Sequence, residues 1–150
     1  MRDAYYKTSA LSAEERRRGC ITASAGNQAQ GVAYAAKKFG VSATIVMPTT
    51  TPYIKVERTK SHGAEVVLAG EVYDESYEHA LKLAEEQGLT FIHPFNDLQV
   101  AAGQGSIAME IVQELPLVDA ILVPIGGGGL ASGVSTLAKM LNPRIKVIGV

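Results

Sequence analysis

Short apolar runs alternate with helical patterns along most of this chain. The runs are mostly β-branched and have the length of buried strands: Cys20–Ala23, Thr44–Met47, Glu65–Leu68, Thr90–Ile92, Ala120–Val123 and Lys146–Val150. Between them apolar residues recur at helical spacing, most clearly over Val72–Gln87. Strands that alternate with helices indicate right-handed βαβ units. The sequence therefore predicts an α/β fold, with parallel sheets flanked by helices in three αβα layers.

Composition limits the class of partner. The chain has 150 residues, 47% of them hydrophobic, which is enough for one solid core or two small ones. Its 14 basic and 15 acidic residues are scattered and give a net charge of −1, so neither nucleic acid nor an anionic membrane is an expected partner. No apolar stretch approaches the roughly 20 residues that span a bilayer. We expect a small-molecule partner and no membrane association.

Cysteine and histidine give no sign of a metal site. The single cysteine, Cys20, lies in an apolar run and has no partner for an internal disulfide, which fits a reducing, cytoplasmic compartment. We expect it to be an inert buried thiol. The histidines at 62, 79 and 93 share no ligand spacing, and no cysteine or carboxylate cluster joins them. The sequence predicts no metal.

A small polar turn follows the first predicted strand. The residues from Ser24 to Gly31 read Ser-Ala-Gly-Asn-Gln-Ala-Gln-Gly, and a helical pattern continues from them to Phe39. Small side chains let a ligand approach the backbone, and a helix start directs unpaired N–H groups at the same place. This arrangement suits an anion, although a purely structural strand-to-helix turn would also use glycine and serine here.

A second turn contains four consecutive glycines, Gly126–Gly129, after the strand that ends at Val123. Such a run is costly in chain entropy, and a structural turn needs only one or two glycines. A cradle of backbone N–H groups for a phosphate is therefore favoured. No Gly-Lys-Ser/Thr follows, which argues against a P-loop. Gly126, Gly128 and Ala131 satisfy the Gly-x-Gly-x-x-Ala form of the dinucleotide fingerprint, but that pattern alone has low specificity.

His93 follows another predicted strand, in the sequence Ile92-His93-Pro94-Phe95-Asn96-Asp97. In parallel sheets ligands bind beyond the carboxyl ends of the strands, where the turns after Ala23 and Val123 also lie. His93 is either a ligand contact or a structural residue at the strand end.

Three motifs together resemble the threonine dehydratase and serine racemase family of fold type II enzymes, which depend on pyridoxal 5'-phosphate. They are Ser24-Ala25-Gly26-Asn27, Ala102-Gly103-Gln104-Gly105 and Gly126–Gly129, and the resemblance covers essentially all 150 residues in order. It implies that the glycine tetrad, Gly126, Gly127, Gly128 and Gly129, binds the cofactor phosphate and that Asn27 binds its phenolic oxygen. It also implies that Ser24, Ala25, Gly26 and Gln28 bind the substrate carboxylate.

The chain departs from the family pattern in two places. The family usually has histidine after the asparagine, whereas Gln28 cannot carry a proton or a positive charge. The family's Ser-Phe-Lys segment would align just before Met1, so the Schiff-base lysine is not in this chain and no catalytic residue is assigned. The segment that contacts the pyridine nitrogen is also absent. We therefore expect a central piece of a longer enzyme, inactive alone, with residues 1–100 in a small domain and 101–150 beginning a larger cofactor domain.

The resemblance implies β-elimination of L-threonine or L-serine to a 2-keto acid and ammonia, within amino-acid metabolism such as isoleucine biosynthesis. Elimination is favoured over racemisation because related racemases have a proton-donating serine where this chain has Ala25. Three alternatives stay open: a racemase-type enzyme, a non-catalytic phosphate or nucleotide-binding module, and an inactive structural fragment. The family also implies a homo-oligomer, and the isolated piece should expose apolar surface and self-associate.

Overall fold

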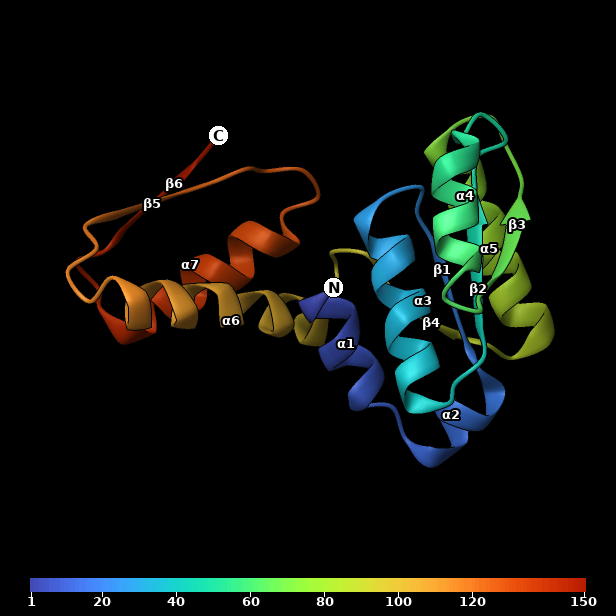
Figure 1. The fold of residues 1–150 in the computed structure, drawn as a ribbon, viewed down its shortest axis with the longest axis horizontal. Helices are drawn as coiled ribbons and strands as arrows, with labels where there is room; N and C mark the ends of the chain where they lie inside the picture. Colours follow the sequence, from blue (N-terminus) through green and yellow to red (C-terminus); the bar gives the residue numbers. More distant parts are fainter.

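The computed structural model describes residues 1–150, which form two parallel sheets in separate halves of the molecule (Figure 1). The first sheet has the order β3-β2-β1-β4, and the second pairs β5 with β6. The strands are β1 (Cys20–Ala23), β2 (Ala43–Met47), β3 (Glu65–Leu68), β4 (Thr90–Phe91), β5 (Ala120–Val123) and β6 (Lys146–Gly149). Every pairing is parallel, which confirms the predicted fold class.

One helix lies between each pair of successive strands, and two helices precede β1. They are α1 (Arg2–Ser9), α2 (Ala13–Arg18), α3 (Asn27–Phe39), α4 (Tyr53–Lys60), α5 (Tyr73–Gln87), α6 (Leu98–Glu114) and α7 (Gly129–Leu141). The predicted strands are confirmed to within one residue at each end. No helix is both long enough and apolar enough to cross a membrane.

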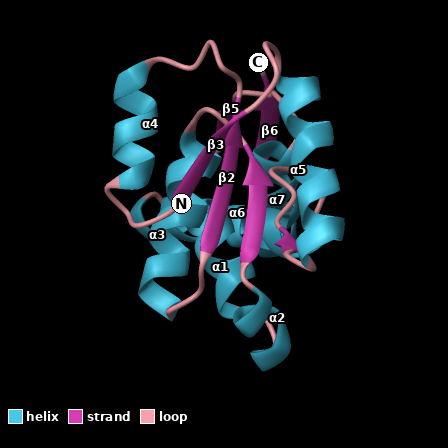
Figure 2. Cartoon of the chain, turned by 90° about the vertical axis from the view of Figure 1, so that its right-hand side faces the viewer, coloured by secondary structure: helices cyan, strands magenta, loops and turns pink.

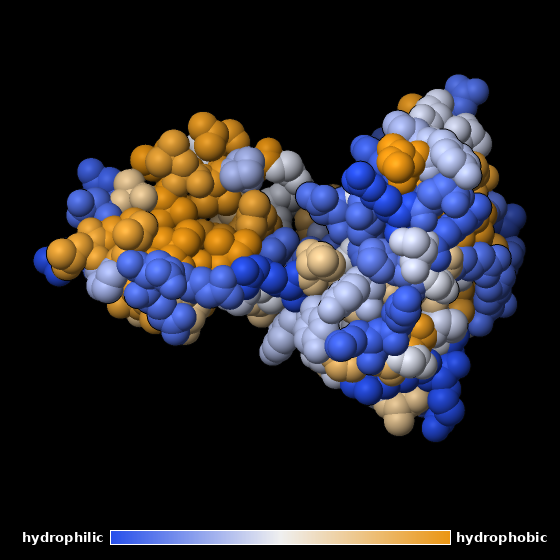
Figure 3. Space-filling model, viewed as in Figure 1, coloured by the Kyte–Doolittle hydropathy of each residue, from blue (hydrophilic) through white to orange (hydrophobic).

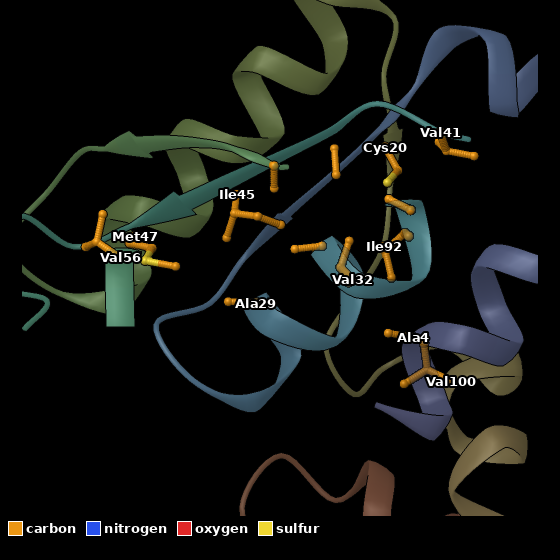
Figure 4. Close-up of a cluster of buried hydrophobic side chains, with 14 residues drawn as sticks. Ala4, Cys20, Ala29, Val32, Val41, Ile45, Met47, Val56, Ile92 and Val100 are labelled. Atoms are coloured by element: carbon orange, nitrogen blue, oxygen red, sulfur yellow. The ribbon is translucent and has the colours of Figure 1, made fainter. Parts of the chain in front are cut away.

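Helices cover both faces of the first sheet (Figure 2). On one face the small residues of α3, among them Ala29, Val32 and Ala33, pack against Cys20 and Ile45 of the strands (Figure 4). The opposite face is covered by α5. Ala80 of this helix packs against Ile21, Ala23 and Val46, the strand residues whose side chains point to that face. Because both faces are buried, the strands read as continuous apolar runs in the sequence. Within this core Cys20 is buried, and burial raises the pKa of its thiol to about 12, as expected for an inert cysteine.

Helix α1 lies between the two halves and packs against both α3 and α6 (Figure 1). Glycines allow the close approach: a Cβ on Gly31 would lie 3.2 Å from Met1 Cα, and one on Gly103 would lie 2.7 Å from Asp3 Cα. The guanidinium of Arg2 binds the carboxylate of Glu110 on α6, and Lys7 pairs with Asp97 at 2.8 Å. Helix α1 therefore ties the first sheet to the helices of the second.

The second sheet leaves one face uncovered. Side chains of β5 alternate between buried and exposed, with Ile121 and Val123 in the core beside α6 and α7. Leu122 on the other face is 66% exposed, and Ile125 and Ile148 are exposed beside it. Figure 3 shows apolar surface gathered over this half of the molecule.

We expect the 150-residue chain to self-associate through this face, because contiguous exposed apolar surface is rare on monomers. Replacement of the exposed leucine by a charge, Leu122→Lys, should shift sedimentation velocity profiles toward the monomer. Leu117→Lys is the matched control, since Leu117 is 93% exposed but belongs to the loop before β5 and not to a strand of the sheet. A wild-type chain that sediments as a monomer at all concentrations would contradict the prediction.

Candidate functional site

Four helices that follow strands, α3, α4, α5 and α7, lack a side-chain cap, and two of them, α3 and α7, have glycine at the N-cap and start at the predicted binding turns. Helix α3 follows β1 and has Gly26 as its N-cap; α7 follows β5 and has Gly128. By contrast, Ser12 and Asp97 cap α2 and α6 with their side chains. The N-termini of α3 and α7 therefore carry unsatisfied N–H groups and the positive end of the helix dipole.

The glycine turn before α7 presents an unbroken series of free backbone donors. None of the N–H groups from Gly126 to Ala131 donates to a protein acceptor, and the first such bond runs from Ser132 to the carbonyl of Gly128 at 2.8 Å. Gly128 has a φ of +87°, which side chains rarely adopt, and a Cβ on Gly126 or Gly128 would meet nothing within 4 Å. The turn is open on that side and is chemically suited to a phosphate dianion.

The turn after β1 offers side-chain hydrogen-bond donors in addition to free backbone N–H groups. The N–H groups of Gln28 and Ala29 lack backbone acceptors, and the first helical bond joins Gln30 to Gly26 at 3.4 Å. Ser24 Oγ accepts a bond from the Gly26 N–H at 3.2 Å, so its own proton is free for another acceptor. Gln28 is only 8% exposed, yet both its amide oxygen and its amide nitrogen lack hydrogen-bond partners. A buried amide without partners is costly, and an anionic ligand could satisfy its N–H groups.

Small-molecule sites have volumes of about 300 to 1,000 Å³, and a cavity of about 510 Å³ lies at the junction of the two halves. It connects the start of α3, where Asn27 is exposed, with Leu130 at the start of α7. Its lining is Met1, Arg2, Asp3, Asn27, Gln30, His62, Gln104, Ile107 and Leu130. We call it the junction cavity. Of the predicted site residues it includes Asn27, whereas Ser24, Ala25, Gly26, Gln28 and Gly126–Gly129 are outside its lining.

The structure gives His93 a structural role. Its Nδ1 accepts hydrogen bonds from the N–H groups of Phe95 at 3.2 Å and Asn96 at 2.8 Å, so Nδ1 is unprotonated. Burial lowers the pKa of His93, and nearby Asp97 opposes that shift. His93 therefore holds the turn after β4 as a neutral imidazole, which is the structural alternative of the two that the sequence left open.

Two of the four glycines have a packing reason that sequence reasoning missed. A Cβ on Gly127 would overlap the ring of Phe95, and one on Gly129 would lie 3.0 Å from Phe95 Cα. The run of four glycines thus combines two open positions with two that admit an aromatic side chain. In the sequence, only the unusual length of the glycine run could have indicated that some of these glycines are needed for packing.

A family model described as pyridoxal-phosphate dependent enzyme matches residues 1–150. The chain belongs to this family. It is 55% identical over 150 residues to an L-threonine ammonia-lyase from Thermotoga maritima, covering 100% of this chain and 37% of that protein. Among solved structures, a processed form of threonine deaminase isoform 2 from Solanum lycopersicum superposes with a TM-score of 0.95 at 50% identity, over 99% of this chain and 43% of that one.

Maize serine racemase gives the same TM-score of 0.95 at 38% identity, over 99% of this chain and 45% of that one. The chain thus spans less than half the length of each of these relatives. The residues at the two turns fit the cofactor that the family name implies. The free N–H groups at Gly126–Gly129 suit its phosphate, and Asn27 has an exposed, uncommitted amide beside the junction cavity.

Proposed function

We propose that residues 1–150 form the substrate and phosphate-binding part of a pyridoxal 5'-phosphate-dependent threonine or serine ammonia-lyase. The observation that carries the proposal is the pair of helix starts after β1 and β5 that have a glycine N-cap and no side-chain cap, with Asn27 and the junction cavity between the halves that hold them. One start has the donors for a phosphate and the other has donors for a carboxylate. The names of the threonine ammonia-lyase and threonine deaminase relatives support this choice.

Each predicted residue has a role in this proposal. Gly126, Gly127, Gly128 and Gly129 hold the cofactor phosphate, and Asn27 donates to its phenolic oxygen. Ser24, Ala25, Gly26 and Gln28 hold the substrate carboxylate through the serine hydroxyl, the Gln28 amide and backbone N–H groups. When bound, the cofactor withdraws electrons from the α-carbon of the amino acid, and the protein supplies orientation and electrostatics.

Ala25 favours elimination over racemisation. Racemisation needs a proton donor on the second face of the α-carbon, and a methyl group has no proton to give. The racemase alternative also has less support, since the maize enzyme is 38% identical and the tomato deaminase 50%. None of the relatives named above is a non-catalytic nucleotide-binding module. We further propose a division into a small domain, 1–100, and the start of a cofactor domain, 101–150, within a cytoplasmic homo-oligomer.

The direct test is production of 2-keto acid and ammonia from L-threonine and L-serine by the whole protein that contains this chain. Borohydride reduction with the cofactor, followed by peptide mapping, should modify none of the lysines within residues 1–150. An adduct at one of them would overturn the alignment of the N-terminus. Cofactor binding without elimination or racemisation would favour the non-catalytic module.

Gln28→Leu separates a substrate contact from a structural role. Leucine keeps the approximate shape and removes a buried amide whose two polar atoms have no partner, so the free energy of unfolding should stay equal or rise. The KM for L-threonine should nevertheless rise about tenfold, the effect expected from loss of a hydrogen bond to a charged group. Urea unfolding and steady-state kinetics measure the two quantities. A fall in stability with an unchanged KM would show that Gln28 is structural.

A further inference from the structure

Phe95 joins the loop after β4 to the glycine turn before α7, although the two segments belong to different sheets. Its ring lies against Gly127, where a Cβ would overlap it, and its backbone lies against Gly129, where a Cβ would be 3.0 Å from Phe95 Cα. Phe95 is 38% exposed, so it is not an ordinary core residue. Phe95 therefore occupies the position that side chains at 127 and 129 would take.

The position of Phe95 is fixed from the side of the first sheet. His93 accepts the backbone N–H of Phe95, and the two rings meet edge to face with centroids 4.8 Å apart at 85°. His93 in turn contacts Tyr77 of α5 at 5.7 Å, and Tyr77 contacts Phe91 of β4 at 5.5 Å. Such edge-to-face pairs are favourable beyond their buried area. An aromatic series thus runs from α5 through His93 to the glycine turn.

The glycine turn has little else to hold its shape. Gly126, Gly127 and Gly128 donate no backbone hydrogen bonds, and glycine is the residue with the greatest backbone freedom. A phosphate cradle binds tightly only when its N–H groups are already aimed at the ligand, because ordering them on binding reduces the affinity. The turn needs an external support, and Phe95 contacts it at both Gly127 and Gly129.

We propose that Phe95 is a positioning residue that holds Gly126–Gly129 in the phosphate-binding conformation. The inference rests on the proposed function, because it takes the glycine turn as the site of the cofactor phosphate. It assigns different reasons to the four glycines. Gly127 and Gly129 admit Phe95, whereas Gly126 and Gly128 leave the opposite side open for the phosphate.

The test compares pyridoxal 5'-phosphate with pyridoxal, which lacks the phosphate, in equilibrium binding to the whole protein. Phe95→Ala should weaken pyridoxal 5'-phosphate about tenfold or more and leave pyridoxal unchanged. Phe95→Tyr, which keeps the ring, should restore the wild-type ratio. Hydrogen exchange of the amides from 126 to 131, measured without ligand, should be faster in Phe95→Ala than in the wild type.

Tyr73→Ala is the matched control. Tyr73 is 37% exposed and belongs to the same aromatic series through Tyr77, but it has no contact with the glycine turn, so the binding ratio should not change. The role of Phe95 would be overturned if Phe95→Ala lost the same affinity for both compounds, or if Phe95→Tyr bound pyridoxal 5'-phosphate as weakly as the alanine variant. Neither outcome would affect the proposed phosphate site. A wild-type protein that binds both compounds equally would overturn the phosphate cradle and, with it, the proposed function of the turn.

Discussion

Gly128→Ala should lower the affinity for pyridoxal 5'-phosphate by about one to two orders of magnitude. Gly128 has a φ of +87°, and left-handed backbone costs a residue with a Cβ about 1–2 kcal/mol. The variant relieves that strain by turning its N–H groups away from the direction they have in the wild type. The added methyl also projects into the open side of the turn, where no protein atom lies within 4 Å and where we place the phosphate.

Gly40→Ala supplies the matched control for backbone strain. Gly40 ends α3 with a φ of +66°, and a Cβ there would also meet nothing within 4 Å. Both variants should lose similar free energy of unfolding, about 1 kcal/mol, in urea titrations. Only Gly128→Ala should bind the cofactor weakly when titrated by absorbance or fluorescence. Equal affinities in the two variants would show that the turn before α7 does not hold the phosphate.

Much of the fold could be predicted because each signal was local. All four residues of Cys20–Ala23 are buried because α3 and α5 cover both faces of the sheet. Glycine ends α3 and α5 at Gly40 and Gly88 in left-handed conformation. Ser12 and Glu15 form a capping box at the start of α2, and a serine three residues before a glutamate is a local signal for the start of a helix. Such features depend on neighbours in the sequence, so a single chain is enough to find them.

The arrangement of the site was harder to predict, because it depends on contacts between distant segments. The resemblance selected Asn27 and Gly126–Gly129, but it gave no reason for Phe95 to lie on the glycine turn. The contact between Phe95 and Gly127 joins loops that follow β4 and β5, which are strands of different sheets. The same holds for α1, whose position between α3 and α6 is visible only in three dimensions. The sequence of α1 itself gives no indication that the helix packs against two partners.

Gly133→Ala should destabilise the protein by about 3 kcal/mol, even though alanine is the better helix former by about 1 kcal/mol. Helices α6 and α7 cross in backbone contact at this point. A Cβ on Gly133 would overlap the carbonyl oxygen of Ala101 and lie 2.9 Å from the N atom of Gly105. Backbone cannot rotate away as a side chain can, so the helices must separate and lose part of the core around Ala108 and Val134.

Ser132→Ala is the control in the same helix, because Ser132 is exposed and its substitution should change the free energy of unfolding by less than about 0.5 kcal/mol. Urea unfolding followed by circular dichroism measures both variants. The sign of the effect decides between two physical terms, since helix propensity alone predicts that Gly133→Ala stabilises α7. A stabilised Gly133→Ala protein would therefore mean that α6 and α7 do not pack with their backbones in contact, and that the start of α7, which carries the glycine turn, is not held against α6.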